Sequence, residues 1–243
     1  METVKKLAER QERLGGAAPV TIAFLGDSVT QGCFENYIIK ENCVDTVFEP
    51  QSSYVTHVGK ILNYLYPRAQ VNIVNAGVSG NAAINGYARL ERDVLRYNPD
   101  LTVVSFGLND SCDTAHADAL ESYLKHLGLI FDKLKKNGSE VIFLTQNYMA
   151  TGVSHLLTDK TLREWAANFA QIQQSGRLKN FFEQAKKLCQ EKSVPVADMY
   201  EAWEYLEKAG TDVTGMLSNK LNHPSRELHK YTAIKVVETM LKS

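Results

Sequence analysis

Residues 20–33 read VTIAFLGDSVTQGC, an apolar run that stops at Gly26 and gives way to small and polar residues. Apolar residues without strict alternation are typical of a strand that is covered on both faces of a sheet. Asp27, Ser28 and Gly32 follow at the point where such a strand has to turn. The stretch therefore predicts a buried strand that ends in a tight turn carrying an acid and a hydroxyl.

Four further runs of the same character recur along the chain, and segments with helical spacing separate them. The runs are VNIVNAG (71–77), LTVVSFG (101–107), EVIFLTQ (140–146) and VPVADMY (194–200). Strands and helices that alternate in this way are typical of a parallel sheet with helices on both faces. The sequence therefore predicts an α/β fold, a three-layer α/β/α sandwich around a five-stranded parallel, flavodoxin-like sheet.

The helical segments have recognisable ends. Residues 52–67 open on a serine cap and close at a proline, and residues 119–138 close on basic residues and a glycine. Helical character also dominates residues 158–192, which Ser175 and Gly176 are expected to split in two. Each helix is long enough to connect two parallel strands.

Residues 34–51 are too many for a tight connection between a strand and a helix, and their content is mixed polar and aromatic. They are interpreted either as a substrate-facing insertion or as a surface excursion with a structural role. Because no Pro/Gly/Ser-rich linker divides the chain, residues 1–243 are expected to form a single domain, with an N-terminal helix at about 2–15 appended.

The charge balance of the chain excludes several classes of partner. The 243 residues are 44% hydrophobic and 23% charged, with a formal net charge of −1 and no basic stripe, so nucleic acid is not an expected partner. The N-terminus lacks the apolar core of a signal peptide, and no stretch approaches the roughly 18 apolar residues of a membrane span. We therefore expect a cytoplasmic protein with no membrane partner, whose oligomeric state is unknown.

The four cysteines form no CxxC pair and no Cys/His cluster at zinc-ligand spacing, so no metal site is predicted. They are expected to be free thiols in a reducing compartment, although two of them could lie near each other in a loop. The positions are Cys33, Cys43, Cys112 and Cys189.

Polar and small residues follow the first three strands, and parallel strands would bring them to one edge of the sheet. Ser28 follows the first strand, Gly77 and Gly80 close the second, and Asn109 follows the third. Taken singly, each has a plain structural interpretation as a helix cap, a turn residue or a glycine with an unusual backbone angle. Their convergence favours a serine nucleophile on a strand-to-helix turn, with its own N–H directed at a developing oxyanion.

A serine nucleophile needs a base, and histidine is the usual base near neutral pH. His223 lies directly before Pro224 in a loop that opens the last helix, whereas His229 lies inside that helix. Because a residue before proline is kept out of the α region, the loop is restricted, and His223 is the better candidate. The other histidines lie in or beside helical patterns and are interpreted as surface or packing residues: His57, His116, His126 and His155.

Four segments resemble the sequence blocks of the GDSL, or SGNH, hydrolases, in the order and at the separations of that family. They are FLGDSVTQG (24–32), NAGVSGNAA (75–83), FGLND (106–110) and NHPSRELH (222–229). One such segment is a weak signal, but the ordered set of four is specific. The resemblance implies an esterase that needs no metal or organic cofactor.

The resemblance also implies a role for each matching residue. Ser28 would be the nucleophile, and His223 would take its proton and return it to the leaving alcohol. The oxyanion hole would be formed by the backbone N–H groups of Ser28 and Gly80 and by the side-chain amide of Asn109. Asp27, a poor base for its neighbour, is interpreted as structural, accepting N–H groups of the turn.

The chain departs from the family at one position. An aspartate usually stands three residues before the histidine and orients its ring, and here that residue is Lys220. A cation cannot accept the ring N–H. Three interpretations stay open: a backbone carbonyl of the loop 218–222 holds His223 in a Ser–His dyad, another acid such as Asp198 substitutes, or the enzyme is impaired.

The sequence thus predicts a serine esterase that hydrolyses small carboxylic esters through an acyl-enzyme. Acetyl or other short-chain esters, including esters of carbohydrates, are the expected substrates. Tyr37, Phe48 and Trp203 are aromatic candidates for the walls of the substrate pocket. The alternatives are a non-catalytic, flavodoxin-like domain that binds a small ligand, and an acyltransferase with the same acyl-enzyme chemistry.

Overall fold

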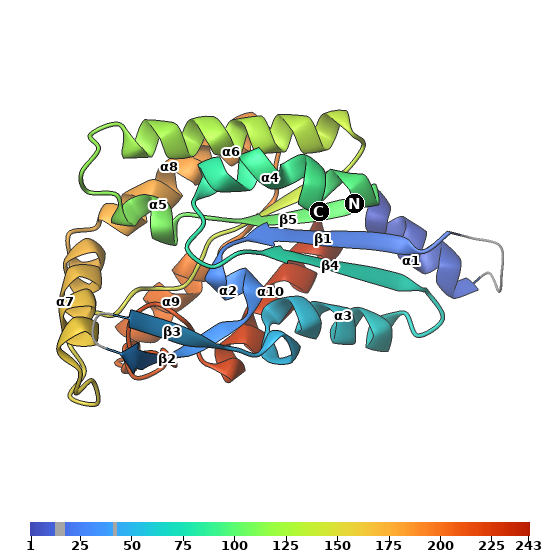
Figure 1. Cartoon of the computed structure of the whole chain (residues 1–243). Coiled ribbons are helices and arrows are strands. Elements are labelled where there is room, and N and C mark those ends of the chain that lie inside the picture. Colours follow the sequence, from blue (N-terminus) through green and yellow to red (C-terminus); the bar gives the residue numbers. More distant parts are fainter. Residues whose placement is uncertain (13–17, 41–42) are drawn as a thin grey trace.

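The computed structural model describes residues 1–12, 18–40 and 43–243 (Figure 1). Its main sheet has five parallel strands in the order β4-β1-β5-β6-β7. In chain order these strands are arranged 2-1-3-4-5, which is the flavodoxin-like order, so the predicted fold is confirmed. The strands are β1 (Val20–Gly26), β4 (Val71–Gly77), β5 (Leu101–Ser105), β6 (Glu140–Leu144) and β7 (Val196–Ala197).

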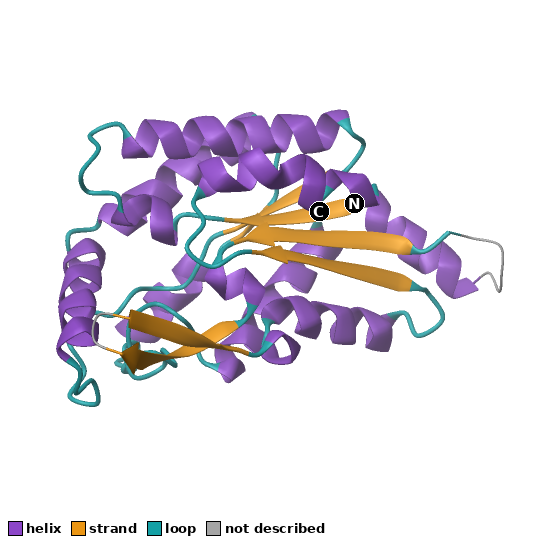
Figure 2. Ribbon diagram, in the orientation of Figure 1, coloured by secondary structure: helices purple, strands orange, loops and turns teal. Residues whose placement is uncertain are grey.

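Helices cover both faces of this sheet and complete three layers (Figure 2). One face carries α4 (Ala83–Asp93), α6 (Ala119–Lys136) and α8 (Arg177–Glu191), and the other carries α3 (Tyr54–Leu65) and α10 (Arg226–Lys242). The large buried side chains lie between the layers and form one continuous apolar core. This packing fixes the carboxyl ends of the strands relative to one another.

The remaining elements lie around the sandwich. They are α1 (Glu2–Glu12), α2 (Ser28–Gln31), β2 (Cys33–Lys40), β3 (Cys43–Phe48), the 3₁₀ turns η1 (Pro50–Ser52) and η2 (Leu95–Tyr97), α5 (Leu108–Cys112), α7 (Lys160–Gln174) and α9 (Met199–Lys208). The predicted N-terminal helix is therefore present over Glu2–Glu12, and its last predicted residues, 13–15, lie outside the described residues.

The strand predictions differ from the structure mainly at the carboxyl ends. β1 and β4 have the predicted bounds, whereas β5 and β6 each end two residues earlier and β7 contains 2 residues. β7 is short because Asp198 directly follows it and accepts the N–H of Glu201 as the N-cap of α9. β4 is an edge strand with several half-exposed or exposed residues, so it is not covered on both faces as expected.

The predicted helix ends are confirmed. The hydroxyl of Ser53 accepts the N–H of Thr56 at 3.3 Å and caps α3. Ser175 and Gly176 separate α7 from α8, and Gly176 adopts a φ of +74°, which glycine reaches without a steric cost. Helical spacing with terminal caps was therefore sufficient to predict these elements.

The long connection after the first strand is an antiparallel pair of strands, β2 and β3, rather than a loop (Figure 1). It lies beside α7, because Val44 of β3 packs against a small apolar cluster made by α7, its preceding loop and the loop before α10. The members of this cluster are Leu157, Leu162, Ala166 and Leu221. This packing places β2 and β3 over the carboxyl edge of the main sheet.

The four cysteines are free thiols in the structure, as expected. Within residues 1–12, 18–40 and 43–243, no helix has the length and apolar character needed to cross a membrane.

Candidate active site

The site is built on the turn between β1 and the short helix α2. Asp27 is the N-cap of α2, and its Oδ1 accepts the N–H of Val29 at 3.0 Å. Ser28 is the first residue of the helix and is buried to 5% exposure. The acid therefore holds the turn, as expected, and the hydroxyl is presented at the carboxyl end of the first strand.

Two glycines allow α2 to sit close against the strands. A Cβ on Gly26 would lie 2.0 Å from the hydroxyl oxygen of Thr30, and a Cβ on Gly77 would lie 2.2 Å from the backbone nitrogen of Gln31. Any side chain at either position would push α2 away from the sheet. The glycines of the first two sequence blocks are thus required by the close approach of the helix that carries Ser28.

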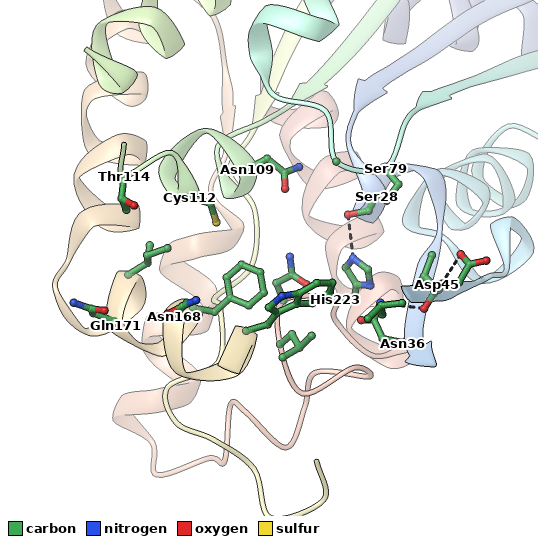
Figure 3. Close-up of a pocket in the computed structure, with 18 of the residues that line it drawn as sticks. Ser28, Asn36, Asp45, Ser79, Asn109, Cys112, Thr114, Asn168, Gln171 and His223 are labelled. Atoms are coloured by element: carbon green, nitrogen blue, oxygen red, sulfur yellow. Dashed lines mark hydrogen bonds between the residues drawn. The ribbon is translucent and has the colours of Figure 1, made fainter. Parts of the chain in front are cut away.

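His223 meets Ser28 although 195 positions separate them in the chain (Figure 3). Nε2 of His223 lies 3.0 Å from Oγ of Ser28, and Nδ1 lies 2.8 Å from the carbonyl oxygen of Phe34. Because a carbonyl oxygen can only accept, Nδ1 carries the proton and Nε2 is the acceptor. This tautomer is the one that can take the proton of the serine hydroxyl.

The loop that carries His223 is organised by one side chain. Oδ1 of Asn219 accepts the backbone N–H groups of Leu221, Asn222 and His223 at 3.0, 3.0 and 2.9 Å. Asparagine commonly folds the backbone back on its own side chain in this way. Sequence analysis missed Asn219, and its position shortly before a His-Pro pair was the available signal.

The electrostatics of the site follow from burial. Burial lowers the pKa of His223 to about 4, and the hydrogen bond to the Phe34 carbonyl and the charge of Glu35 oppose that shift. Burial raises the pKa of Asp27 to about 6, against the hydrogen bond that Gln146 donates to it at 2.8 Å. The imidazole is therefore neutral, and able to accept a proton, throughout the physiological range of pH.

The three predicted oxyanion donors lie beside Ser28. Ser28 itself contributes an N–H of the first helical turn, which has no helical partner. Gly80 adopts a φ of +76°, and within the described residues its N–H donates no hydrogen bond. The Asn109 amide, on α5, donates to the Asn81 carbonyl at 2.9 Å and to Asp27 Oδ2 at 3.3 Å.

Neither Lys220, at the position usual for the acid, nor Asp198, the suggested substitute, is among the hydrogen-bond partners of the His223 ring. Lys220 has a φ of +59°, and its ammonium donates to the Gly215 carbonyl at 2.5 Å. Asp198 accepts from the Thr145 hydroxyl and pairs with Lys186 at 3.0 Å, and it caps α9. The ring is held by a backbone carbonyl, but that carbonyl belongs to β2 and not to the predicted loop 218–222.

Ser28, Gly80, Asn109 and His223 line one cavity of about 950 Å³ (Figure 3). Its remaining walls come from β2 and β3, from α5, α7 and the start of α8, and from the loops after β4 and α5, between α7 and α8, and before α10. The insertion 34–51 therefore does face the site. These wall residues are Asn36, Val44, Asp45, Thr46, Phe48, Ser79, Cys112, Thr114, Trp165, Asn168, Phe169, Gln171, Ile172, Ser175, Arg177, Leu221 and Asn222.

The aromatic residues of the cavity differ in part from those expected. Phe48 lines it, Tyr37 is exposed outside it, and Trp203 is fully buried in the core, so the suggestions of Tyr37 and Trp203 were wrong. Trp165 and Phe169 of α7 supply the other aromatic surface, and Trp165 is 41% exposed. Helical periodicity in the sequence could not show which residues of α7 face the cavity and which face solvent.

In the part of the chain that the structure describes, no three His, Cys, Asp or Glu side chains are grouped so that they could hold a metal ion. The polar groups of the cavity are instead hydroxyls, amides, one thiol, one imidazole, one carboxylate and one guanidinium. They are suited to hydrogen bonding with a neutral, oxygen-rich molecule.

A strand-to-helix turn that presents a serine, a histidine on a distant loop and an amide beside them are features of serine hydrolases built on this fold. The model of the GDSL-like lipase/acylhydrolase family matches residues 24–231. The chain therefore belongs to the GDSL-like lipase/acylhydrolase family.

Individual relatives agree with this assignment. An acetylxylan esterase from Geobacillus stearothermophilus is 33% identical over 89 residues, which span 37% of this chain and 39% of that relative. The solved structure of a catalytic mutant of an acetylxylan esterase from the same organism superimposes with a TM-score of 0.68 at 19% identity, covering 93% of this chain and 96% of that one. A lipase/acylhydrolase from Enterococcus faecalis superimposes with a TM-score of 0.67 at 21% identity, covering 91% and 95%. These structures share the fold of the chain.

Proposed function

We propose that this protein is a serine esterase that hydrolyses short-chain carboxylic esters, acetyl esters of carbohydrates in particular, through an acyl-enzyme. The observation that carries the proposal is the 3.0 Å contact between Ser28 Oγ and the unprotonated Nε2 of His223. A nucleophile in hydrogen-bond contact with a base whose other nitrogen is held by a third group is the arrangement that acyl transfer requires.

In the first half of the reaction, Ser28 Oγ attacks the ester carbonyl carbon while Nε2 of His223 takes the hydroxyl proton. The tetrahedral intermediate then collapses, the bond to the alcohol oxygen breaks, and His223 returns the proton to that oxygen. In the second half, a water molecule attacks the acyl-enzyme, His223 accepts the proton of the water, and the carboxylic acid leaves as Ser28 regains its hydrogen. No external oxidant, metal or cofactor enters these steps.

The negative charge of each tetrahedral intermediate would be stabilised by the N–H groups of Ser28 and Gly80 and by the Asn109 amide. Within the described residues the N–H groups of Ser28 and Gly80 donate no hydrogen bond and are free to bind an oxyanion, whereas the Asn109 amide donates to Asn81 and Asp27. Removing one donor of this kind typically lowers kcat by about 10²- to 10³-fold.

The cavity supports a carbohydrate ester as substrate. Trp165 and Phe48 offer exposed aromatic faces, and Asn168 and Asn222 offer side-chain amides, on the walls of the cavity. Sugars are bound by stacking of their C–H faces on aromatic rings and by hydrogen bonds to their hydroxyls. The acetylxylan esterases that resemble this chain act on substrates of this class according to their names.

The proposal is tested with para-nitrophenyl acetate and with an acetylated xylo-oligosaccharide. Ser28→Ala and His223→Ala should each lower kcat by at least about 10⁴-fold, and Asn109→Ala by about 10²- to 10³-fold. Ser122→Ala and His126→Ala, which replace residues of α6 away from the cavity, should leave the rate unchanged.

Two results would overturn this proposal. Turnover that survives in Ser28→Ala would remove the nucleophile, and a wild-type protein without turnover would favour a binding domain. Addition of a sugar acceptor distinguishes hydrolysis from acyl transfer: an esterase releases acetate, whereas an acyltransferase yields acetylated acceptor and little acetate.

A further inference from the structure

Three residues of the segment NHPSRELH contact a single residue of β2, Phe34. Nδ1 of His223 lies 2.8 Å from the Phe34 carbonyl oxygen. The guanidinium carbon of Arg226 lies 4.3 Å from the centre of the Phe34 ring, and the imidazole centre of His229 lies 4.9 Å from it. Phe34 is itself fully buried. Its backbone and its side chain are therefore both held by the loop and helix that position the histidine.

Arg226 pairs with two carboxylates near Phe34, one in β2 and one directly after β3. Its guanidinium donates to the two carboxylate oxygens of Glu35 at 2.7 and 3.1 Å, and to Glu49 Oε2 at 2.6 and 2.8 Å. Glu35 directly follows Phe34 in β2, and Glu49 directly follows β3. One arginine thus joins the start of β2 to the end of β3, through the planar, bidentate geometry that a guanidinium provides.

His229 also packs against the ring of Phe34. It is fully buried, its Nδ1 accepts the Tyr54 backbone N–H at 3.0 Å, and its ring is stacked on that of Tyr54 at an interplanar angle of 16°. Burial and the charges of His223, His57 and Arg226 lower the pKa of His229 to about 3, so the ring is neutral. Phe34 is consequently packed against an arginine and a neutral imidazole that cannot easily move.

We propose that Phe34, clamped by Arg226, takes the place of the missing triad acid and is the positioning residue for His223. The inference rests on the proposed esterase function. The carbonyl of Phe34 keeps the imidazole in the tautomer with hydrogen on Nδ1, which is one of the two tasks of a triad carboxylate. The clamp consists of Arg226 and its two partners, Glu35 and Glu49. Because a misplacement of about 1 Å can cost about 10²-fold in rate, the clamp contributes by holding the Phe34 carbonyl in a fixed position.

The clamp is separable from the stability of the fold. The Arg226 side chain is 34% exposed, and the Glu35 and Glu49 side chains are 43% and 38% exposed. Ion pairs with this degree of exposure typically add little to stability. Loss of the clamp should therefore be visible in the chemistry of His223 before it is visible in unfolding.

The test compares Arg226→Gln and Arg226→Lys with Arg96→Gln. Arg96 also lies over an aromatic ring, that of Tyr97, at 5.4 Å, but it is remote from the cavity. Arg226→Gln should lower kcat roughly 10- to 100-fold with KM changed by less than about threefold. Arg226→Lys, which keeps the charge and loses the bidentate geometry, should recover part of the rate, and Arg96→Gln should match the wild type.

Nitrogen NMR of the His223 ring supplies a readout that does not depend on turnover. In the wild-type protein the ring should be the single tautomer with hydrogen on Nδ1, and in Arg226→Gln a mixture of tautomers with a higher pKa is expected. Burial, the hydrogen bond to the Phe34 carbonyl and the charge of Glu35 set the pKa of His223. Ser28 and His229 also face the ring, and none of these residues is altered in the variant.

A wild-type tautomer and rate in Arg226→Gln would overturn the proposal. If the wild-type protein shows no turnover that depends on Ser28, the esterase function fails, and the NMR comparison still decides whether the clamp orients the ring.

Lys220→Asp provides a second check, since it restores an acid at the position usual for the family. Because Nδ1 is already bonded to Phe34, this variant should gain nothing, and a tenfold rise in kcat would contradict the clamp.

Discussion

At the scale of single residues, the chemistry of the site depends on a histidine that burial keeps neutral. A triad carboxylate would hold the pKa of the imidazole up, but the partner here is an uncharged carbonyl. Burial is therefore the largest influence on the ring and lowers the pKa of His223 to about 4. Because its pKa is this low, the ring stays neutral and available as a base at mildly acidic pH.

This predicts an unusual acid limb for the reaction. An unperturbed histidine base would be lost below about pH 6.5, whereas kcat/KM for phenyl acetate should stay near its plateau down to about pH 5. The measurement is kcat/KM between pH 3.5 and 9, with a substrate whose leaving group does not ionise in that range. An acid limb centred near pH 6.5 would show that the free enzyme holds His223 in a solvated or carboxylate-paired state.

At the scale of elements, the short helix α2 is wedged between the strands that flank it. β1 leads into α2, and β4 lies beside it with Gly77 directly against the backbone of Gln31. The Asn75 amide donates to the Thr30 carbonyl at 2.9 Å. The side-chain oxygen of Gln31, Oε1, accepts the backbone N–H of Ser79 at 2.7 Å. The nucleophile turn and the loop that carries Gly80 are therefore positioned together.

Gly77→Ala should disturb this arrangement. The added methyl would lie 2.2 Å from a backbone nitrogen, which cannot move without displacing α2. Stability should fall by about 2 kcal/mol, as for other overpacked sites, and kcat should fall by about tenfold or more. Denaturant unfolding and steady-state kinetics measure the two effects.

Gly152→Ala is the matched control, because a Cβ there meets no atom within 4 Å. It should behave as the wild type in both measurements. A Gly77→Ala protein with unchanged kcat would mean that the position of α2 is not critical for the reaction.

At the scale of the whole molecule, the carboxyl edge of the sheet holds two buried carboxylates. Asp27 directly follows β1 and Asp110 lies in α5, which follows β5, at the edge where the strand order reverses and where sites are expected in this fold. Burial raises the pKa of Asp110 to about 7, and the Ala83 N–H, bonded to its Oδ1 at 2.9 Å, opposes the shift. Its other oxygen has no hydrogen-bond partner among the described residues.

The sign of the pH dependence follows from this shift. A carboxyl whose pKa is higher in the folded state binds its proton more tightly there, so its contribution to stability is present below about pH 4 and is lost as the pH rises through about 7. Asp110→Asn cannot titrate. The difference in Tm between Asp110→Asn and wild type should therefore move in favour of the variant by about 5 °C from pH 5 to pH 8.

Thermal unfolding at the two pH values measures this difference. Asp118→Asn, which replaces an exposed aspartate, serves as the control and should show the same pH dependence as the wild type. A constant difference in Tm for Asp110→Asn would mean that this carboxyl is already ionised at pH 5 in the folded protein.

Much of the fold could be predicted because it depends on local patterns. The apolar runs gave β1 and β4 their bounds, and capping residues such as Ser53 and Gly176 gave the helix ends. The insertion after Phe34 could not be predicted as two strands, since its stability comes from packing against α7 and not from its own alternation. β7 was overestimated for a related reason, because capping of α9 by Asp198 ends it early.

The sequence by itself determined the order of strands and helices, the family blocks, and the candidates Ser28, Gly80, Asn109 and His223, because each depends on residue type and spacing. Only the tertiary structure decided what holds the histidine. Lys220 occupies the position where an acid was expected. The carbonyl that takes the role of that acid belongs to Phe34, which lies 189 positions from His223 in the chain. Backbone carbonyls are present at every residue, so their identity carries no signal in a sequence, and only folding selects the one that meets the ring.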